Sequence, residues 1–493
     1  MGAYSDYGRT GNADAIPSIG EFYKDDFKIG AAVASHWLFK EDFDRTIQKH
    51  ITSVTAENDM KPEAVLDREA TIKAGSGVRA QLTFKKVAPI MEYARKNNIA
   101  LRYHTLLWHN QTPRWFFAEN WSDDKEAKLA DRDTMIKRLQ NFISDVMEYV
   151  NEKWPGLVYA WDVVNEAIEP DHNAENLFRT KSLWYEILKE DFVFLAFREA
   201  SKHKADGQEL FYNDFNVAMP NKTDAVWNLV KRLKDENVID GIGFQTHIGL
   251  DYPDFGDYER AVMRFSELSL TIQSTEMDIR MPTADEKSQM KLAIRYKEYF
   301  GMMKRLKNAG AKIDSITLWG LTDDHSWLMG WNGPSFPLLF DGLLRPKAAF
   351  FGAILDESIP EKIEEAKGNE ALEAETKAPV QEIGGAAYSG MEILKTPFGD
   401  AVYARVPGCW MLKKDIDFTG KSEIAIRFYC ICDLDVKVIL DDLKNEPTYE
   451  IKLSREVKAG ESAIALDGKA HGTHDAYFVF TAPSVRILEL VIR

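Results

Sequence analysis

The clearest strand signal in the chain reads Val158-Tyr159-Ala160-Trp161-Asp162-Val163-Val164-Asn165-Glu166. Its apolar, β-branched body predicts a buried strand that ends in an amide and a carboxylate. Seven further segments of this kind occur before residue 323: Phe27–Val33, Ile51–Asn58, Ala100–His109, Glu209–Asn216, Ile239–His247, Leu270–Glu276 and Ser315–Thr322. Helical periodicity separates them, as in Phe84–Asn97 and Thr134–Glu152. Eight alternations of strand and helix predict an α/β fold, a (β/α)8 TIM barrel over residues 17–357.

Two carboxylates fall at predicted strand ends. Glu166 closes the fourth strand, and Glu276 closes the seventh within Ser274-Thr275-Glu276-Met277-Asp278. The carboxyl ends of barrel strands form the face that carries the chemistry in this fold. Two acids on either side of a sugar linkage are the usual apparatus of glycoside hydrolysis. The chain has 78 acidic residues, so the argument depends on what surrounds these two.

Composition excludes several classes of partner. The 493 residues are 45% hydrophobic and 28% charged, which is typical of a globular protein with an ample core. A net charge of −16 argues against nucleic acid or an anionic membrane surface as a partner, but not against a neutral polysaccharide. No apolar run approaches the roughly 18 residues of a membrane span.

The first thirty residues show no secretory leader. We expect a secreted protein whose leader has been removed, with a cytoplasmic location as the alternative. The sequence does not indicate an oligomeric state.

A second region begins after Leu355. We predict an acidic linker over residues 358–379 and a small all-β sandwich, similar to a jelly roll, over residues 380–493. The predicted strands are Ala401–Arg405, Glu423–Cys432, Val436–Leu440, Glu450–Leu453, Ala476–Phe480 and Val485–Ile492. Three cysteines, Cys409, Cys430 and Cys432, lie in this region and have no metal-binding spacing, so we interpret them as buried thiols.

The other barrel strands also end in side chains suited to sugars. Amides and imidazoles pair with hydroxyl groups, and indoles stack on the apolar faces of sugar rings. The candidates are Glu57, Asn58, Lys61, His104, Trp108, Gln111, Asn165, Asn213, Gln245, His247, Asp278, Trp319 and Trp327. His104, His109 and His247 could suggest zinc, but no cysteine or supporting pattern accompanies them, so we predict no catalytic metal.

Six strand ends together resemble glycoside hydrolase family 10, the endo-β-1,4-xylanases. They are Trp161–Ala167, Thr275–Asp278, His104–His109, Glu57–Lys61, Tyr212–Asp214 and Trp319–Asp323, with Gln245–His247 as a seventh. The resemblance covers residues 17 to 357. It implies a retaining endo-β-1,4-xylanase that acts on xylan and xylo-oligosaccharides and needs no cofactor.

The resemblance also implies a role for each candidate. Glu166 would be the acid/base, protonated at the start, and Glu276 the ionised nucleophile. His247 would bind Glu276, with Asp278 orienting the imidazole. Asn165 and His104 would hold the sugar at the cleavage point, and Asn213 and Gln245 would be further substrate-binding residues. Glu57, Asn58, Lys61 and Gln111 would bind the next sugar, and Trp108, Trp319 and Trp327 would wall the pocket. A retaining reaction places the two carboxyl groups about 5–5.5 Å apart.

Two alternatives remain open. A hydrolase on the same type of barrel could act on β-1,4-glucan or mannan, and a barrel without catalysis could bind polysaccharide. In the second region, Trp410–Phe418 and Gly472–Phe480 resemble strands of the family 6 type of carbohydrate-binding module. A structural calcium there is left open.

Overall fold

The computed structural model describes residues 3–4, 16–169, 177–330, 334–362, 381–383, 386–389, 391–396, 399–404, 409–430, 433–454, 456–481 and 485–493. Contacts divide the chain into two compact units. The first comprises Met1–Ile279, Tyr296–Leu321 and Ala353–Ser358, and the second comprises Arg280–Arg295, Thr322–Gly352 and Ile359–Arg493. Most of the predicted linker, from residue 363 to 379, lies outside the described residues.

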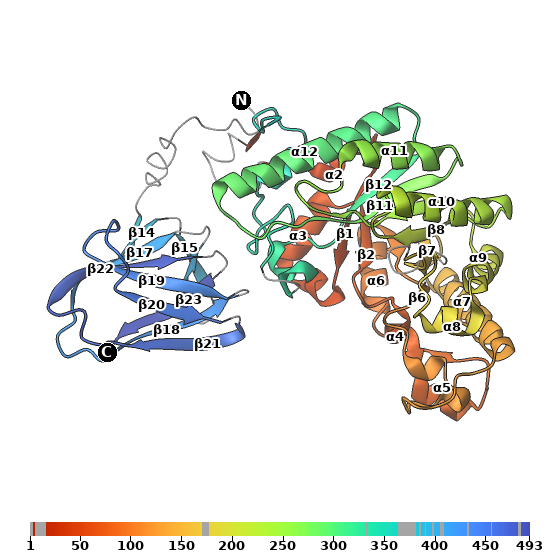
Figure 1. Ribbon diagram of the computed structural model, residues 1–493, viewed down its shortest axis with the longest axis horizontal. Helices are drawn as coiled ribbons and strands as arrows, with labels where there is room; N and C mark the ends of the chain where they lie inside the picture. The colour runs from red at the N-terminus through yellow and green to blue at the C-terminus, as the bar shows by residue number, and fades with distance from the viewer. Residues whose placement is uncertain are drawn as a thin grey trace. The chain divides into compact units, whose positions relative to one another are not determined.

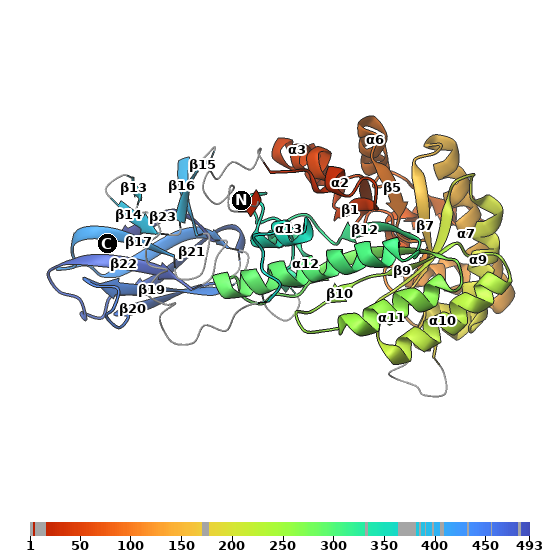
Figure 2. The same cartoon turned by 90° about the horizontal axis from the view of Figure 1, so that it is seen from above.

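The first unit contains a closed barrel of eight parallel strands (Figures 1 and 2). The strands are β1 (Lys28–Val33), β2 (Ser53–Ala56), β5 (Ala100–Tyr103), β7 (Val158–Asn165), β8 (Glu209–Asp214), β9 (Gly241–Phe244), β11 (Thr271–Ile279) and β12 (Ile313–Leu318). β12 pairs with β1, and β11 pairs with both β9 and β12, which closes the ring. The predicted (β/α)8 barrel is therefore confirmed.

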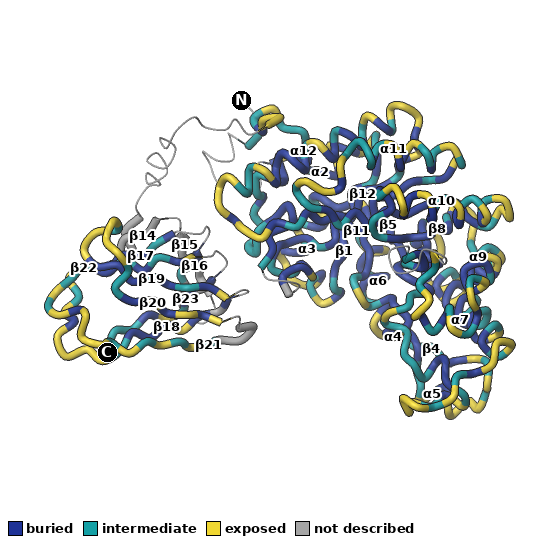
Figure 3. The backbone as a smooth tube through the Cα atoms, in the orientation of Figure 1, coloured by how far each residue is buried: buried dark blue, intermediate teal, exposed yellow. Residues whose placement is uncertain are grey.

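Short strands extend this framework. β6 (Leu107–Trp108) pairs with β7, and β10 (His247–Ile248) pairs with β11. β3 (Leu66–Asp67) and β4 (Gln81–Leu82) form a separate antiparallel pair. The barrel strands are buried along nearly their whole length, as the dark blue tube in Figure 3 shows. Burial on both faces explains why each strand is a nearly continuous apolar run.

The helices follow the strands along the chain, and α7, α9, α10 and α11 lie outside the barrel strands (Figure 2). The α-helices are α2 (Ile19–Phe22), α3 (Glu41–His50), α4 (Pro62–Val65), α5 (Arg68–Ala74), α6 (Ala88–Asn97), α7 (Arg132–Lys153), α8 (Leu183–Leu188), α9 (Asp191–His203), α10 (Pro220–Asp235), α11 (Phe255–Ser266), α12 (Glu286–Asn308) and α13 (Ala348–Ala353). Short 3-10 helices are η2 (Ser35–Phe39), η3 (Arg114–Phe116), η4 (Glu119–Trp121), η6 (Asp323–His325) and η7 (Trp327–Gly330).

Local sequence sets the helix boundaries. α7 begins two residues before the predicted helix because the Asp131 side chain accepts a hydrogen bond from the Thr134 amide and caps the first turn. Its buried stripe includes Leu139, Ile143 and Val146, at the spacing of one helix face. α6 begins four residues after the predicted helix, and Pro89 sits in its first turn, where a missing amide proton costs nothing.

The second unit contains two antiparallel sheets. One has the order β13 (Gln381–Ile383), β14 (Ala386–Ser389), β17 (Trp410–Asp417), β22 (Thr473–Phe480), β19 (Leu434–Leu440) and β20 (Tyr449–Leu453). The other has the order β15 (Met391–Thr396), β16 (Gly399–Ala404), β23 (Val485–Ile492), β18 (Glu423–Cys430) and β21 (Glu456–Ala465). Ile426 and Phe428 of one sheet share a single core with Val438 and Phe478 of the other. The predicted all-β sandwich is confirmed.

Two of the three cysteines are described. Cys409 and Cys430 are buried and not joined by a disulfide, while Cys432 lies outside the described residues. Within the described ranges, every helix is too short or too polar to cross a membrane.

Candidate active site

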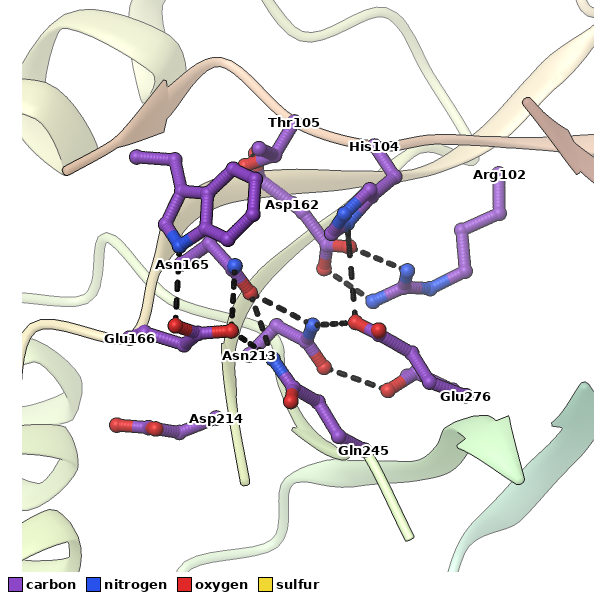
Figure 4. Close-up of polar contacts among 12 residues, drawn as sticks. Arg102, His104, Thr105, Asp162, Asn165, Glu166, Asn213, Asp214, Gln245 and Glu276 are labelled. Atoms are coloured by element: carbon purple, nitrogen blue, oxygen red, sulfur yellow. Dashed lines mark hydrogen bonds and ion pairs between the residues drawn. The ribbon is translucent and has the colours of Figure 1, made fainter. Parts of the chain in front are cut away.

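A hydrogen-bond network joins the two candidate glutamates across the carboxyl end of the barrel (Figure 4). The Asn213 amide donates to Oε1 of Glu276 at 2.7 Å and to Oδ1 of Asn165 at 2.8 Å. Asn165 in turn donates to Oε1 of Glu166 at 3.2 Å. The Gln245 amide donates to that same oxygen of Glu166 at 2.9 Å. Residues on or next to four strands therefore hold two carboxyl groups in one connected arrangement. Glu276 does not close its strand as predicted, because β11 continues to Ile279.

Strand register explains why these side chains meet. Asn165 of β7 lies beside Asn213 of β8, and Asn213 lies beside Gly243 of β9. A Cβ atom at Gly243 would lie 2.3 Å from Oδ1 of Asn213, so only glycine allows this amide its position. Glu166 follows β7 with φ at 55°, a left-handed conformation that few side-chain-bearing residues adopt and that is frequent at functional sites.

Glu276 is held as a carboxylate. It is only 5% exposed, and His247 Nε2 lies 3.4 Å from its Oε2 while His104 Nδ1 lies 4.0 Å from its Oε1. Burial is the largest single influence and raises the pKa of Glu276. The charge of His104, then His247 and the Asn213 hydrogen bond, outweigh it and lower the pKa to about 2. Glu276 is therefore ionised at any ordinary pH.

Asp278 holds His247 in place. β10 and β11 bring the two residues side by side, and Nδ1 of His247 lies 2.9 Å from Oδ1 of Asp278. Burial, the largest influence, lowers the pKa of His247, but Asp278 and then Glu276 raise it to about 10. The imidazolium thus lies between two carboxylates and has one nitrogen for each.

Glu166 has a different environment. The indole Nε1 of Trp108 donates a hydrogen bond to Oε2 of Glu166 at 3.0 Å. Trp108 was predicted only as an aromatic residue of the pocket, and it also contacts a candidate catalytic group directly. Trp108 lies beside Asn165 in the β6–β7 pairing. The Arg179 guanidinium donates to the backbone oxygen of Glu166 at 3.2 Å. Trp108, with Asn165 and Gln245, orients the carboxyl group, while Arg179 holds the backbone of Glu166.

Sequence reasoning missed a buried ion pair beneath the site. Arg102 and Asp162 are fully buried and form a bidentate pair, and Arg102 also donates to Gln273 at 2.9 Å. Oδ2 of Asp162 lies 2.8 Å from Nδ1 of His104, which fixes the ring. Asp162 lies within the apolar strand segment Val158–Glu166. A carboxylate in such a segment was the sequence feature that could have indicated a buried ion pair. Burying an unpaired charge costs free energy, so a cationic partner for Asp162 could have been predicted, although not which residue supplies it.

The four residues assigned to the next sugar lie close together. Lys61 is 6% exposed, and its ammonium donates to Oδ1 of Asn58 at 3.0 Å, while Gln111 donates to the same oxygen at 3.3 Å. The Lys61 ammonium also lies 4.7 Å from the centre of the Trp108 ring. Burial lowers the pKa of Lys61, and burial raises the pKa of Glu57, whose charge interacts with Lys61.

The two remaining tryptophans differ. Trp319 is buried and meets the rings of His104 and His247 edge-on, at 5.3 and 6.5 Å between centroids. Trp327 is 38% exposed and belongs to the second unit, so its assignment stays a prediction.

His109 has a noteworthy environment. Burial lowers the pKa of this imidazole to about 4, and its Nδ1 lies 3.9 Å from Oε2 of Glu166. Among the described residues that nitrogen has no hydrogen-bond partner. No group of three or more histidine, cysteine, aspartate or glutamate side chains in the described ranges could hold a metal ion.

Comparison with known proteins gives the family. The model of glycosyl hydrolase family 10 matches residues 18–356. The chain is 40% identical over 346 residues to endo-1,4-beta-xylanase B of Butyrivibrio fibrisolvens, which covers 68% of this chain and 53% of that protein. The chain therefore spans about half the length of that curated relative.

Solved structures agree. The crystal structure of endo-1,4-beta-xylanase from Caldicellulosiruptor owensensis is 36% identical, with a TM-score of 0.59, over 69% of this chain and 99% of that one. A mutant xylanase from Thermoanaerobacterium saccharolyticum, solved in complex with xylotriose, is 33% identical, with a TM-score of 0.60 and the same coverage. The match over residues 18–356 and the 40% identity to a curated relative show that this chain belongs to glycosyl hydrolase family 10.

Proposed function

We propose that the chain is a retaining endo-β-1,4-xylanase that cleaves internal linkages of xylan by double displacement. The observation that carries the proposal is the hydrogen-bond network from Glu166 through Asn165 and Asn213 to Glu276. Relatives named as xylanases, one of them solved with xylotriose, support xylan as the substrate class.

The first step uses the two carboxyl groups in different protonation states. Carboxylate Glu276 attacks the anomeric carbon, while protonated Glu166 gives its proton to the leaving glycosidic oxygen. The oxygen–carbon bond breaks as the Glu276–carbon bond forms, which leaves a glycosyl-enzyme ester. The donors Trp108, Asn165 and Gln245 hold Glu166 in one orientation during this transfer.

The second step reverses the roles. Glu166, now ionised, removes a proton from water, and the water oxygen attacks the anomeric carbon and releases Glu276. The cation His247 stays beside Glu276, so the carboxylate is stabilised as it is released. Two inversions retain the anomeric configuration.

The proposal also divides the chain into a barrel at residues 17–357, a linker at 358–379 and an accessory sandwich at 380–493. Buried Lys61, together with Asn58 and Gln111 next to Trp108, would bind the neighbouring xylose unit. The same groups could accept glucose or mannose, so polymer preference has to be measured.

The test is the release of reducing ends, with product analysis, on xylan, carboxymethyl cellulose and mannan. We expect short xylo-oligosaccharides from xylan and little from the other two polymers. Preference for another polymer would overturn the substrate and keep the two-glutamate mechanism. Binding of xylan without hydrolysis would favour a polysaccharide-binding protein.

A further inference from the structure

The backbone that follows Glu166 is held by a tyrosine hydroxyl that has no part in the two steps described above. The amides of Ala167 and Ile168 donate to the hydroxyl oxygen of Tyr212, at 3.0 and 3.1 Å, and these three residues are buried. The amide of Glu166 itself donates to the Asn213 carbonyl of β8 at 2.9 Å. Because a buried amide without an acceptor costs free energy, the tyrosine replaces the strand ladder at the point where the chain leaves it.

The hydrogen-bonding capacity of the Tyr212 hydroxyl is fully used. A hydroxyl has one proton and two acceptor positions. The two amides can only donate, so they take the acceptor positions and the proton goes to Oδ2 of Asp214. Asp214 is fully buried, and its Oδ1 accepts from the Lys222 ammonium at 2.7 Å and from the Phe215 amide at 2.9 Å. Asp214 therefore fixes the direction of the hydroxyl proton and leaves the oxygen to the backbone after Glu166.

Glu166 needs this support because of its own backbone conformation. Its φ of 55° lies in the left-handed region, which a residue with a side chain keeps only where its surroundings enforce it. The peptide group after Glu166 is held on both sides, since Arg179 donates to its oxygen at 3.2 Å and Tyr212 accepts from its N–H. A relaxed φ would reorient the side chain and take its carboxyl group away from the donors Trp108 and Gln245.

We infer that Tyr212 is a positioning residue for proton transfer by Glu166, which rests on the proposed function and deepens it. Side chains alternate along a strand, so on β8 Tyr212 points to the opposite face from Asn213, whose amide binds Glu276. Because Tyr212 is also fully buried, it acts on the acid/base through the backbone and not by contact with the substrate. Loss of its hydroxyl should impair proton transfer by Glu166 and leave the attack by Glu276 intact.

The test is Tyr212→Phe, which removes one oxygen atom and keeps the ring. The measurement is kcat/KM, which reports the first step, on two aryl xylobiosides that differ in their need for a proton from Glu166. On phenyl xylobioside, a poor leaving group, we expect kcat/KM to fall about ten- to hundredfold, as for a misplaced catalytic group. On 2,4-dinitrophenyl xylobioside, which needs no proton, kcat/KM should stay within about twofold.

The matched control is Tyr23→Phe. The Tyr23 hydroxyl is also fully buried and bonds to the backbone, donating to the Ala353 oxygen at 2.6 Å. Its loss should leave the ratio of the two kcat/KM values unchanged. Both values are measured on the same sample, so an unfolded fraction of either variant cancels from the ratio.

A double-mutant comparison separates positioning from a general structural role. If Tyr212 acts through Glu166, adding Tyr212→Phe to Glu166→Ala should cause no further loss on phenyl xylobioside. Equal losses on both xylobiosides, no loss on either, or a further loss in the Glu166→Ala background would each overturn the inference and leave the proposed function standing. Absence of hydrolysis of xylan and of both xylobiosides by the unmutated chain would instead overturn the proposed function.

Discussion

Replacing Asp278 with asparagine should make activity depend on the protonation of His247. Asp278 is 1% exposed and lies 2.9 Å from the imidazole, and among the influences that raise the pKa of His247 its charge is the largest. Without that charge, burial lowers this pKa, and we expect it to fall well below its value in the unmutated enzyme. At pH 8 the ring is then neutral, and Glu276 loses a nearby cation.

The size of the effect follows from the pKa. The difference between 6.5 and about 10 corresponds to about 5 kcal/mol between the two protonation states of His247, at 1.36 kcal/mol per pH unit. If the variant loses about half of this free energy, ~2.5 kcal/mol, from the stabilisation of the transition state, kcat falls nearly 100-fold, since each 1.36 kcal/mol changes a rate tenfold. At pH 5.5 the imidazole is protonated again, and we expect a loss of only about tenfold.

Stability should change in the matching direction. Because folding raises the pKa of His247, protonation of this imidazole stabilises the folded state. The contribution is fully present below the unfolded-state pKa of about 6.5 and is lost as the pH rises through about 10. Between these two pH values the unmutated enzyme should lose stability through His247, and the Asp278→Asn enzyme should lose less of it.

The assay is kcat from pH 5 to 9 on a soluble aryl xyloside, with an NMR titration of His247 and thermal unfolding at pH 6.5 and 9.5. Asp240→Asn is the matched control, since Asp240 precedes β9 at the opposite end of the barrel and pairs with Lys204. A loss of the same size at pH 5.5 and pH 8, or a His247 pKa still near 10, would refute the reasoning.

Three further substitutions test the surrounding groups. Glu166→Ala should slow hydrolysis of xylosides with poor leaving groups by several orders of magnitude and spare those whose leaving group needs no proton; equal losses would remove Glu166 from the acid role. Trp108→Phe removes the indole donor to Glu166 and should lower kcat about tenfold, and an unchanged kcat would mean that the bond does not position the acid. Arg102→Met leaves Asp162 buried without its cation and should cost about 3–5 kcal/mol in urea unfolding; a loss below about 1 kcal/mol would contradict the buried pair.

The sequence predicted the barrel well because each strand is an apolar run closed by polar residues. The ends differ where residues leave the ladder to form the site. The predicted strand Ile51–Asn58 is observed as Ser53–Ala56, so Glu57 and Asn58 lie just beyond its carboxyl end. The predicted strand Ala100–His109 is two strands, because the chain leaves the ladder at His104 and rejoins as β6.

Other features could not be predicted, because they depend on contacts that exist only in the closed barrel. No local pattern pairs Arg102 with Asp162, which are 60 residues apart and meet only inside the barrel. The indole bond from Trp108 to Glu166 likewise depends on the β6–β7 register. In the second unit, β21 has few apolar residues in alternation, so its sequence Glu456–Ala465 gave no strand signal.

Trapping of the glycosyl-enzyme tests the central claim most directly. A 2-deoxy-2-fluoro-xylobioside with a good leaving group slows both steps and lets the ester accumulate on an enzyme with Glu166→Ala. Peptide mass spectrometry should find one fluoroxylobiosyl group on the peptide that contains Glu276, on that residue itself. A label on any other residue, or turnover with inversion and no label, would contradict the two-glutamate account.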